Sequence, residues 1–229
     1  MEERDIKILV IGILSMCIIF LGYRLLKEDP HEFLKRGTVD KEEIEISVPR
    51  NIKIPKGETI EITWPASLVE MSQSSDESID DVLEAVNVGN EDFFWQEKAY
   101  GNEDGSITLV LTQEQLEHRI NSVEETIKKA MRENNDKMEI VIGQDFQSVV
   151  YYIKEGCTTS TWMWVYVVIT ANMIEAQMLL GTLPQNWDIK QKVIAERTGE
   201  ILFETSLRYE NFEITDEEWN QKVGVEVAD

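Results

Sequence analysis

The sequence predicts an α+β protein: a mainly antiparallel sheet of β-hairpins packed against two long helices, 113–133 and 161–180, preceded by one N-terminal transmembrane helix. Three observations support this. Short runs of alternating apolar and polar residues are separated by turn residues, a pattern typical of hairpins. Apolar residues recur at helical spacing in 113–133. Residues 8–26 are almost entirely apolar.

The 229-residue chain divides into five predicted parts, and the largest is long enough for one domain with its own core. They are a tail at 1–7, a transmembrane anchor at 8–26, a charged tether at 27–43, an α+β extracytoplasmic domain at 44–208 and an acidic tail at 209–229.

The anchor prediction depends on the stretch "ILVIGILSMCIIFLGYRLL". As a helix it spans about 28 Å, close to the hydrocarbon thickness of a bilayer. A cleavable signal peptide has a shorter apolar region and a small-residue cleavage site. "LSMC" has the shape of a lipobox, but Met16 stands where a small residue is expected and apolar residues follow Cys17. A permanent anchor is favoured, lipidation of Cys17 is disfavoured, and other cleavage stays open.

The charge balance is 22 basic to 44 acidic residues, a net charge of -22. Such a surface repels nucleic acid, so no nucleic-acid partner is expected. Solubility explains the charge most simply, and attraction of cations or a basic partner is the alternative. Four basic residues flank the uncharged stretch 8–23 on its carboxyl side and two flank it on its amino side, so the positive-inside rule by itself favours a cytoplasmic domain. These are Arg24, Lys27, Lys35 and Arg36 against Arg4 and Lys7.

The first half of the domain shows strand, helix and hairpin patterns in turn. Residues 44–64 alternate isoleucine with polar residues, which predicts short strands. A helix is predicted near 76–87, with a Ser74–Glu77 capping box and Gly89 as its end. Residues 93–112 predict a hairpin that turns at Asp104 and Gly105. "NEDG" also suggests a calcium loop, but Leu111 stands where the bidentate glutamate is required.

The clearest helix is 113–133, with a capping box formed by Thr112 and Gln115. Hairpins are predicted in 138–154 and in 187–207. Between them, the apolar run 161–180 fits a buried strand by composition and a helix by length. A second membrane span is a third interpretation, which polar residues within the run oppose. The acidic tail is interpreted as a short helix at "TDEEW" or as disorder.

No catalytic, cofactor-binding or metal-binding residue is nominated. The chain has no HExxH, G-x-S-x-G or Walker A pattern. His31 falls in the tether, and His118 falls outside the apolar stripe of its helix and is expected to be solvated. Cys157 beside Gly156 could act as a nucleophile, but a free, partly buried thiol in a loop is expected, because no basic partner lies nearby in the sequence. Acidic residues are so numerous that adjacent pairs carry no information, and carboxylates distant in sequence leave no motif, so a hydrolase stays open.

Four segments resemble a group of uncharacterised extracytoplasmic proteins and lipoproteins of clostridial bacteria: "ITWPASLVE", "NEDGSITLVLTQEQLEHRINSVEETIKKAM", "GQDFQSVVYYI" and "VIAERTGEILFETS". The resemblance covers residues 58–208. It implies that 161–180 is a helix packed on a sheet, with Trp162, Trp164, Tyr166 and Met173 in the core. It also implies that the domain lies outside the membrane, against the count of flanking charges. Met16 departs from the lipoprotein signal common in the group.

The sequence therefore predicts a single-pass cell-membrane protein with its domain on the extracytoplasmic face. A non-catalytic module that binds an envelope protein, peptide or glycan is favoured over an enzyme. Two alternatives stay open: an envelope hydrolase that uses dispersed carboxylates, and a membrane adaptor that faces the cytoplasm.

Overall fold

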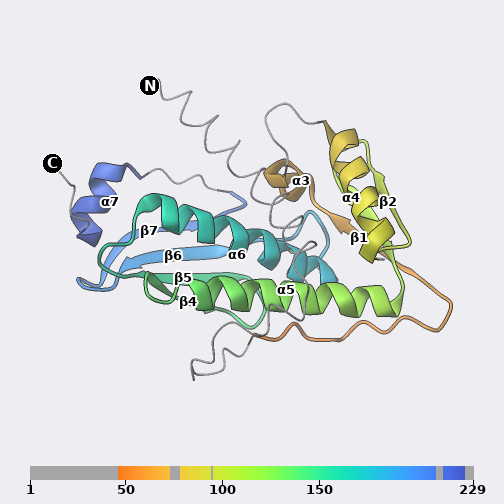
Figure 1. The fold of residues 1–229 in the computed structure, drawn as a ribbon, viewed down its shortest axis with the longest axis horizontal. Helices are drawn as coiled ribbons and strands as arrows, with labels where there is room; N and C mark the ends of the chain where they lie inside the picture. The colour runs from red at the N-terminus through yellow and green to blue at the C-terminus, as the bar shows by residue number, and fades with distance from the viewer. Residues whose placement is uncertain (1–45, 73–77, 94, 210–213, 225–229) are drawn as a thin grey trace.

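The computed structural model describes residues 46–72, 78–93, 95–209 and 214–224 (Figure 1). The predicted tail 1–7, anchor 8–26 with Cys17, and tether 27–43 lie outside these residues. No helix within the described ranges is both long enough and apolar enough to cross a membrane.

The α+β class is confirmed, with two sheets where one was expected. The smaller sheet is antiparallel, in the order β1 (Ile60–Trp64), β3 (Ile107–Leu111), β2 (Lys98–Gly101). The larger sheet has the order β4 (Met138–Ile142), β5 (Ser148–Ile153), β6 (Lys190–Ala195), β7 (Glu200–Ser206). The helices are α3 (Ala66–Ser72), α4 (Ile79–Phe93), α5 (Gln113–Glu133), α6 (Thr159–Leu179) and α7 (Asp216–Val223).

The larger sheet is mixed. Its two predicted hairpins, β4–β5 and β6–β7, are both present and antiparallel. They join through a parallel pair, β5–β6, in which Tyr151 lies opposite Val193. A parallel neighbour requires a crossover connection, and α6 supplies it. Hairpin turns are encoded locally, whereas the pairing between hairpins depends on where α6 returns the chain.

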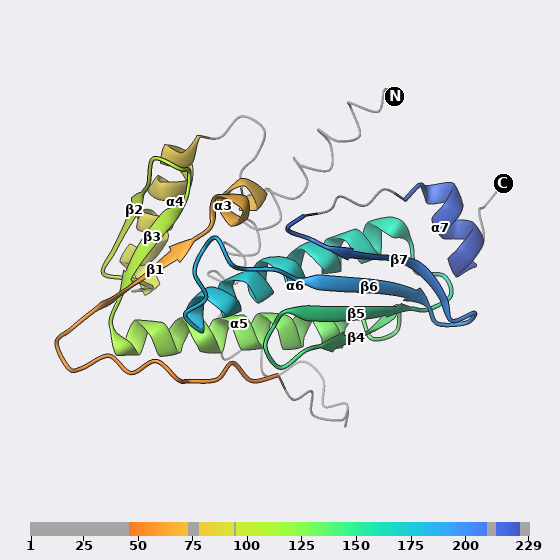
Figure 2. The same cartoon turned by 180° about the vertical axis from the view of Figure 1, so that it is seen from behind.

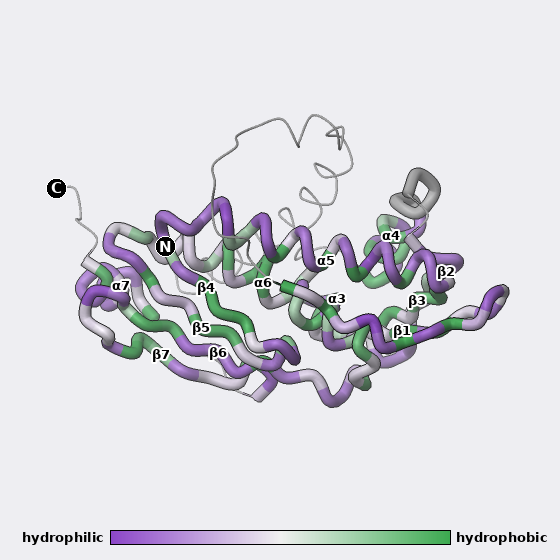
Figure 3. The backbone as a smooth tube through the Cα atoms, turned by 90° about the horizontal axis from the view of Figure 1, so that it is seen from below, coloured by the Kyte–Doolittle hydropathy of each residue, from purple (hydrophilic) through white to green (hydrophobic). Residues whose placement is uncertain are grey.

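The apolar run after residue 158 is the helix α6, as the resemblance implied. Its N-cap is Thr158, whose side chain accepts from the Thr161 backbone N–H. Its length and its burial against the larger sheet and α5 favour helix over the strand propensity of its residues. Figures 1 and 3 show α5 and α6 side by side on one face of the larger sheet.

The helix α5 follows its sequence pattern closely. Both bonds of the Thr112–Gln115 capping box are present, and its buried residues repeat at helical spacing. The helix α4 differs from expectation, because it continues through Gly89 to Phe93. Its first turn is held by reciprocal hydrogen bonds between Ser78 and Asp81. The predicted cap at Ser74 and Glu77 lies outside the described residues.

The smaller sheet and α3 lie beside one end of the helix pair (Figure 2). The β2–β3 hairpin turns at Asp104 and Gly105 as predicted, with Gly105 at φ +83°. A backbone conformation with positive φ favours glycine, because glycine has no Cβ atom. The helix α3 was not anticipated: it starts directly after Pro65, whose carbonyl accepts from the Leu68 and Val69 amides.

Candidate functional site

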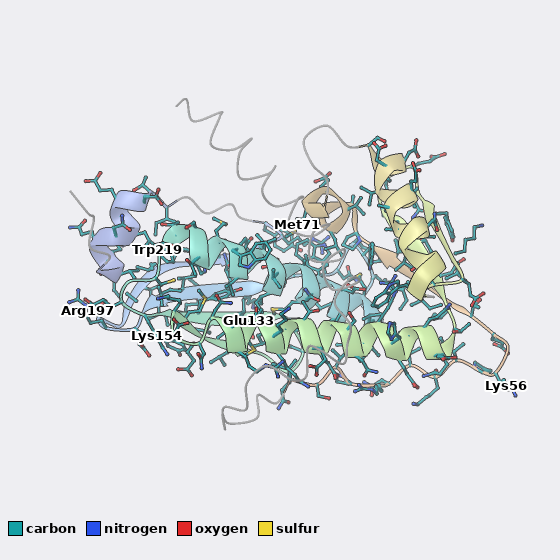
Figure 4. The ribbon with its side chains drawn as sticks, in the orientation of Figure 1. Lys56, Met71, Glu133, Lys154, Arg197 and Trp219 are labelled. Carbon is teal, nitrogen blue, oxygen red and sulfur yellow. The ribbon has the colours of Figure 1, made fainter. Side chains whose placement is uncertain are left out.

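A pocket of about 370 Å³ lies where α3, α6 and the segments flanking β6 and β7 meet. Met71, which marks this junction in Figure 4, belongs to its wall. A volume of this size is near the lower end of the range for small-molecule sites. The lining residues are Ser67, Glu70, Met71, Tyr166, Thr170, Trp187, Leu207 and Arg208.

The lining residues that belong to α3 lie on one face of that helix, and those that belong to α6 lie on one face of α6. Ser67, Glu70 and Met71 stand at positions i, i+3 and i+4 of α3, so they lie on one side of that helix. Tyr166 and Thr170 stand four residues apart on α6. The pocket is therefore a space between two helical faces, closed on a third side by non-helical chain.

The third side is formed where the chain enters β6 and leaves β7. The Leu207 amide donates to the Ile189 carbonyl at 3.0 Å, which extends the pairing of the two strands. Arg208 Nη1 donates to the Trp187 carbonyl at 3.2 Å, and its guanidinium lies 5.3 Å from the Tyr209 ring centre. Trp187 is 7% exposed, so the indole is a firm wall.

Two opposite charges line this pocket without pairing. Glu70 and Arg208 form no ion pair with each other. Within the described ranges, Glu70 accepts no side-chain hydrogen bond and has no ion-pair partner. Among partners in the described part of the chain, Arg208 uses one of its five N–H donors, on the Trp187 carbonyl. Glu70 is exposed and Arg208 is half-buried, and both line the pocket with capacity for further hydrogen bonds.

Tyr166 and Thr170 of α6 bring two hydroxyl groups to the pocket lining, and Tyr151 of β5 is fully buried. Burial raises the pKa of Tyr166 to about 12, and the Thr170 hydroxyl opposes that rise. Burial also raises the pKa of Tyr151, with a further contribution from Tyr166. In the described part of the chain, neither Tyr151 Oη nor Thr170 Oγ1 makes a hydrogen bond of ordinary geometry. The Tyr166 hydroxyl on this side of the pocket is therefore uncharged at neutral pH.

The charged side chains that line the pocket are one carboxylate, Glu70, and one guanidinium, Arg208. Glu70 is the single carboxylate among its lining residues, whereas glycoside hydrolysis by carboxylates requires two. Its lining also holds no cysteine or histidine, so a nucleophile–base pair of the usual kind is not formed there. The described residues contain no cluster of three or more potential metal ligands.

The residues weighed from the sequence lie elsewhere. Cys157 is fully buried, its thiol points to the Thr158 carbonyl, and burial raises its pKa to about 11. His118 is exposed on α5, and the centre of its imidazole ring lies 4.4 Å from the centre of the Trp95 ring. Of the adjacent acidic residues, Asp81 and Glu218 cap helices, while Glu124 is buried and pairs with Arg50 at 3.2 Å.

Sequence reasoning missed the pocket. Tyr166 was expected in the core, yet it lines the pocket, whereas Trp162 and Met173 are fully buried as expected. The lining comes from four separate segments, and its charged members are two ordinary surface-type residues. Pro65 was the one local signal for α3, because proline readily precedes or begins a helix.

A second charged cluster is structural. Arg119 is buried and donates to Glu175 at 2.9 Å, to Gln96 Oε1 at 2.6 Å and to the Trp95 carbonyl at 3.3 Å. Its guanidinium also lies 5.2 Å from the Trp64 ring centre. Burial lowers the pKa of Arg119, and Glu175 opposes this. All three guanidinium nitrogens have protein acceptors, so the cluster joins α5, α6 and the smaller sheet and offers no ligand site.

No protein-family model matches the chain, and neither a curated protein nor a solved structure matches it. The resemblance to clostridial envelope proteins therefore stays a prediction, and the pocket is the basis for a functional proposal.

Proposed function

We propose that the chain is a membrane-anchored binding protein. In this proposal residues 8–26 span the cell membrane, the α+β domain lies on the extracytoplasmic face, and a small ligand binds in the pocket without being chemically changed. One observation carries the proposal: Glu70 and Arg208 line a pocket with apolar walls and do not pair with each other.

The pocket supports binding over hydrolysis. Its walls include Met71, Trp187 and Leu207, which can cover an apolar ligand surface. Binding sites combine such walls with a few convergent polar groups that fix orientation. A single carboxylate does not supply the acid and base that hydrolysis of a glycan needs.

The binding step is tested with the full chain in detergent micelles. Native mass spectrometry against a panel of amino acids, short peptides and glycan fragments is expected to detect at least one adduct. Ser67→Trp places a bulky ring in the pocket and is expected to abolish that adduct. Glu84→Trp, on the exposed side of α4, is the matched control. Absence of any adduct, or an adduct that both variants retain, would contradict a ligand-binding pocket.

The location is tested separately by treating intact cells with an exterior protease. Degradation of the domain, while a cytoplasmic control survives, is the expected result. If the domain survives and a known exterior protein is degraded, the domain faces the cytoplasm and the adaptor alternative replaces this one. The four basic residues on the carboxyl side of the uncharged stretch 8–23 are the observation in favour of that alternative.

A further inference from the structure

We infer that the ligand of the Glu70–Arg208 pocket is a small zwitterion with an apolar body, the chemistry of a free amino acid such as leucine or phenylalanine. This inference rests on the proposed function and specifies its ligand. The carboxylate of the ligand lies against Arg208, its ammonium group lies against Glu70, and its side chain lies between the rings.

Arg208 is suited to a carboxylate because part of its guanidinium is already fixed. The bond from Nη1 to the Trp187 carbonyl and the contact with the Tyr209 ring hold the group in place. The remaining N–H donors form a planar fork, which matches the two oxygens of a carboxylate. A positioned guanidinium loses little conformational entropy when the ligand arrives.

Glu70 supplies the opposite charge. It lies on the same face of α3 as Ser67 and Met71, and no other described side chain bonds to its carboxylate. A carboxylate accepts hydrogen bonds only, so an ammonium group, with three donors, is its natural partner. The Ser67 hydroxyl and the buried Thr170 hydroxyl lie on the same lining and add polar contacts.

Size and wall chemistry select the ligand body. The pocket volume of about 370 Å³ lies near the lower end of the range for small-molecule sites, so the pocket has room for a ligand of the size of leucine or phenylalanine. Tyr166, Trp187, Met71 and Leu207 form apolar walls around that space. Burial of an apolar side chain against them contributes about 25 cal/mol for each Å² removed from water.

Other ligand classes leave one charge unsatisfied. A phosphate or other simple anion pairs with Arg208 but is repelled by Glu70. A simple cation pairs with Glu70 and leaves Arg208 partly desolvated. A neutral saccharide covers both charges without neutralising either, and desolvating an unpaired charge is costly. A zwitterion is the class that satisfies both groups together.

The test is isothermal titration of the full chain in detergent with four probes. L-Phenylalanine carries both charges, phenethylamine only the ammonium, 3-phenylpropionate only the carboxylate, and chitotriose neither. L-Phenylalanine is expected to bind, and each of the three others is expected to bind at least tenfold more weakly, because a hydrogen-bonded charge contributes about tenfold to hundredfold in affinity.

Variants assign each charge to its partner. Arg208→Gln is expected to weaken L-phenylalanine at least tenfold without weakening phenethylamine, which does not use that charge. Glu70→Gln is expected to weaken L-phenylalanine at least tenfold without weakening 3-phenylpropionate. Arg197→Gln, at the far end of the larger sheet (Figure 4), and Glu84→Gln are the matched controls. Urea unfolding of every variant shows whether the fold is retained.

The outcomes separate this inference from the proposed function. If L-phenylalanine does not bind, or if both charge variants bind it as the wild type does, the zwitterion assignment is wrong. If chitotriose or a peptide binds instead and Ser67→Trp abolishes that binding, the pocket still has a binding function and the ligand class alone has failed. If no probe or panel compound is sensitive to Ser67→Trp, both fail together.

Discussion

The indole Nε1 of Trp219 donates a hydrogen bond to the backbone carbonyl of Cys157 at 2.8 Å, across 62 residues of sequence. Trp219 is fully buried, and its ring centre lies 5.1 Å from that of Trp162 on α6. Trp219 lies on the helix α7. This helix begins with a capping box formed by Thr215 and Glu218, and its C-cap is Gly224. The C-terminal segment therefore contributes a side chain to the core, and the helical interpretation of "TDEEW" is the correct one.

Replacing Trp219 with alanine is expected to lower the free energy of unfolding by about 3–5 kcal/mol, the range for truncating a buried tryptophan. Trp219→Phe keeps most of the packing and loses the indole hydrogen bond, so it is expected to cost less. Urea denaturation of the full chain measures both. If the free energy of unfolding of Trp219→Ala lies within about 0.5 kcal/mol of the wild-type value, as for a surface substitution, then α7 does not support the core.

Cys157 is expected to resist alkylation in the folded protein. Its side chain has no exposed surface, and burial raises the pKa of its thiol to about 11, so little thiolate is present at neutral pH. The experiment uses Cys17→Ser, which leaves a single cysteine. Mass spectrometry after maleimide treatment is expected to show labelling only in urea. Rapid labelling of the native protein would mean that the thiol lies near the surface.

Removing one partner of the Arg119–Glu175 pair is expected to lower the free energy of unfolding more than replacing both partners with apolar residues. Arg119→Met leaves Glu175 without its charged partner and is expected to cost about 3 kcal/mol or more. Arg119→Met combined with Glu175→Leu is expected to recover part of that loss, because neither charge then stays uncompensated. The exposed Lys192–Glu204 pair, at 2.8 Å, is the control, and its Lys192→Met variant is expected to change stability by less than about 1 kcal/mol. A double variant less stable than Arg119→Met would oppose this account.

Replacing the buried Gln191 with an apolar residue is expected to stabilise the folded protein. The residue has no exposed surface, and in the described part of the chain neither polar atom of its amide makes a hydrogen bond. Gln191→Leu removes the desolvation cost of that amide and is expected to raise the free energy of unfolding by about 1 kcal/mol. Gln115→Leu is the contrasting variant, since the Gln115 amide caps α5 and binds Glu97, and it is expected to destabilise the protein. Destabilisation by Gln191→Leu would indicate that the amide has a bonding partner.

Local signals were sufficient for much of the fold. The cap at Thr112, the turn at Gly105 and the two hairpins of the larger sheet each depend on a few adjacent residues, and the structure contains all of them. Pairing between hairpins was not predictable, because the parallel contact of β5 with β6 depends on the crossover through α6. The continuation of α4 through Gly89 shows that a single glycine does not by itself end a helix, since it costs only about 1 kcal/mol relative to alanine.

The candidate site was not predictable by the same means. Glu70 and Arg208 are 138 positions apart in a chain with 44 acidic residues, so no spacing rule relates them. Tyr166 belongs to an apolar run in which core and pocket-lining positions have the same composition. The buried Glu124 was likewise indistinguishable from its exposed neighbour Glu125, because its partner Arg50 comes from an irregular segment.

The raised pKa of Tyr166 makes the free energy of unfolding depend on pH in the alkaline range. Its pKa rises from the ordinary value of 10.0 to about 12 because burial disfavours the phenolate. A group whose pKa is raised by folding gives stability that is complete below its unfolded pKa and is lost as pH rises through its folded pKa. The contribution is therefore expected to be intact below pH 10 and to fall by about 2 kcal/mol between pH 10 and 12. Urea unfolding across this range should show a shallower decline for Tyr166→Phe, while Tyr209→Phe, at a residue 73% exposed, should follow the wild type. Parallel declines for Tyr166→Phe and the wild type would rule out Tyr166 as a source of the alkaline instability.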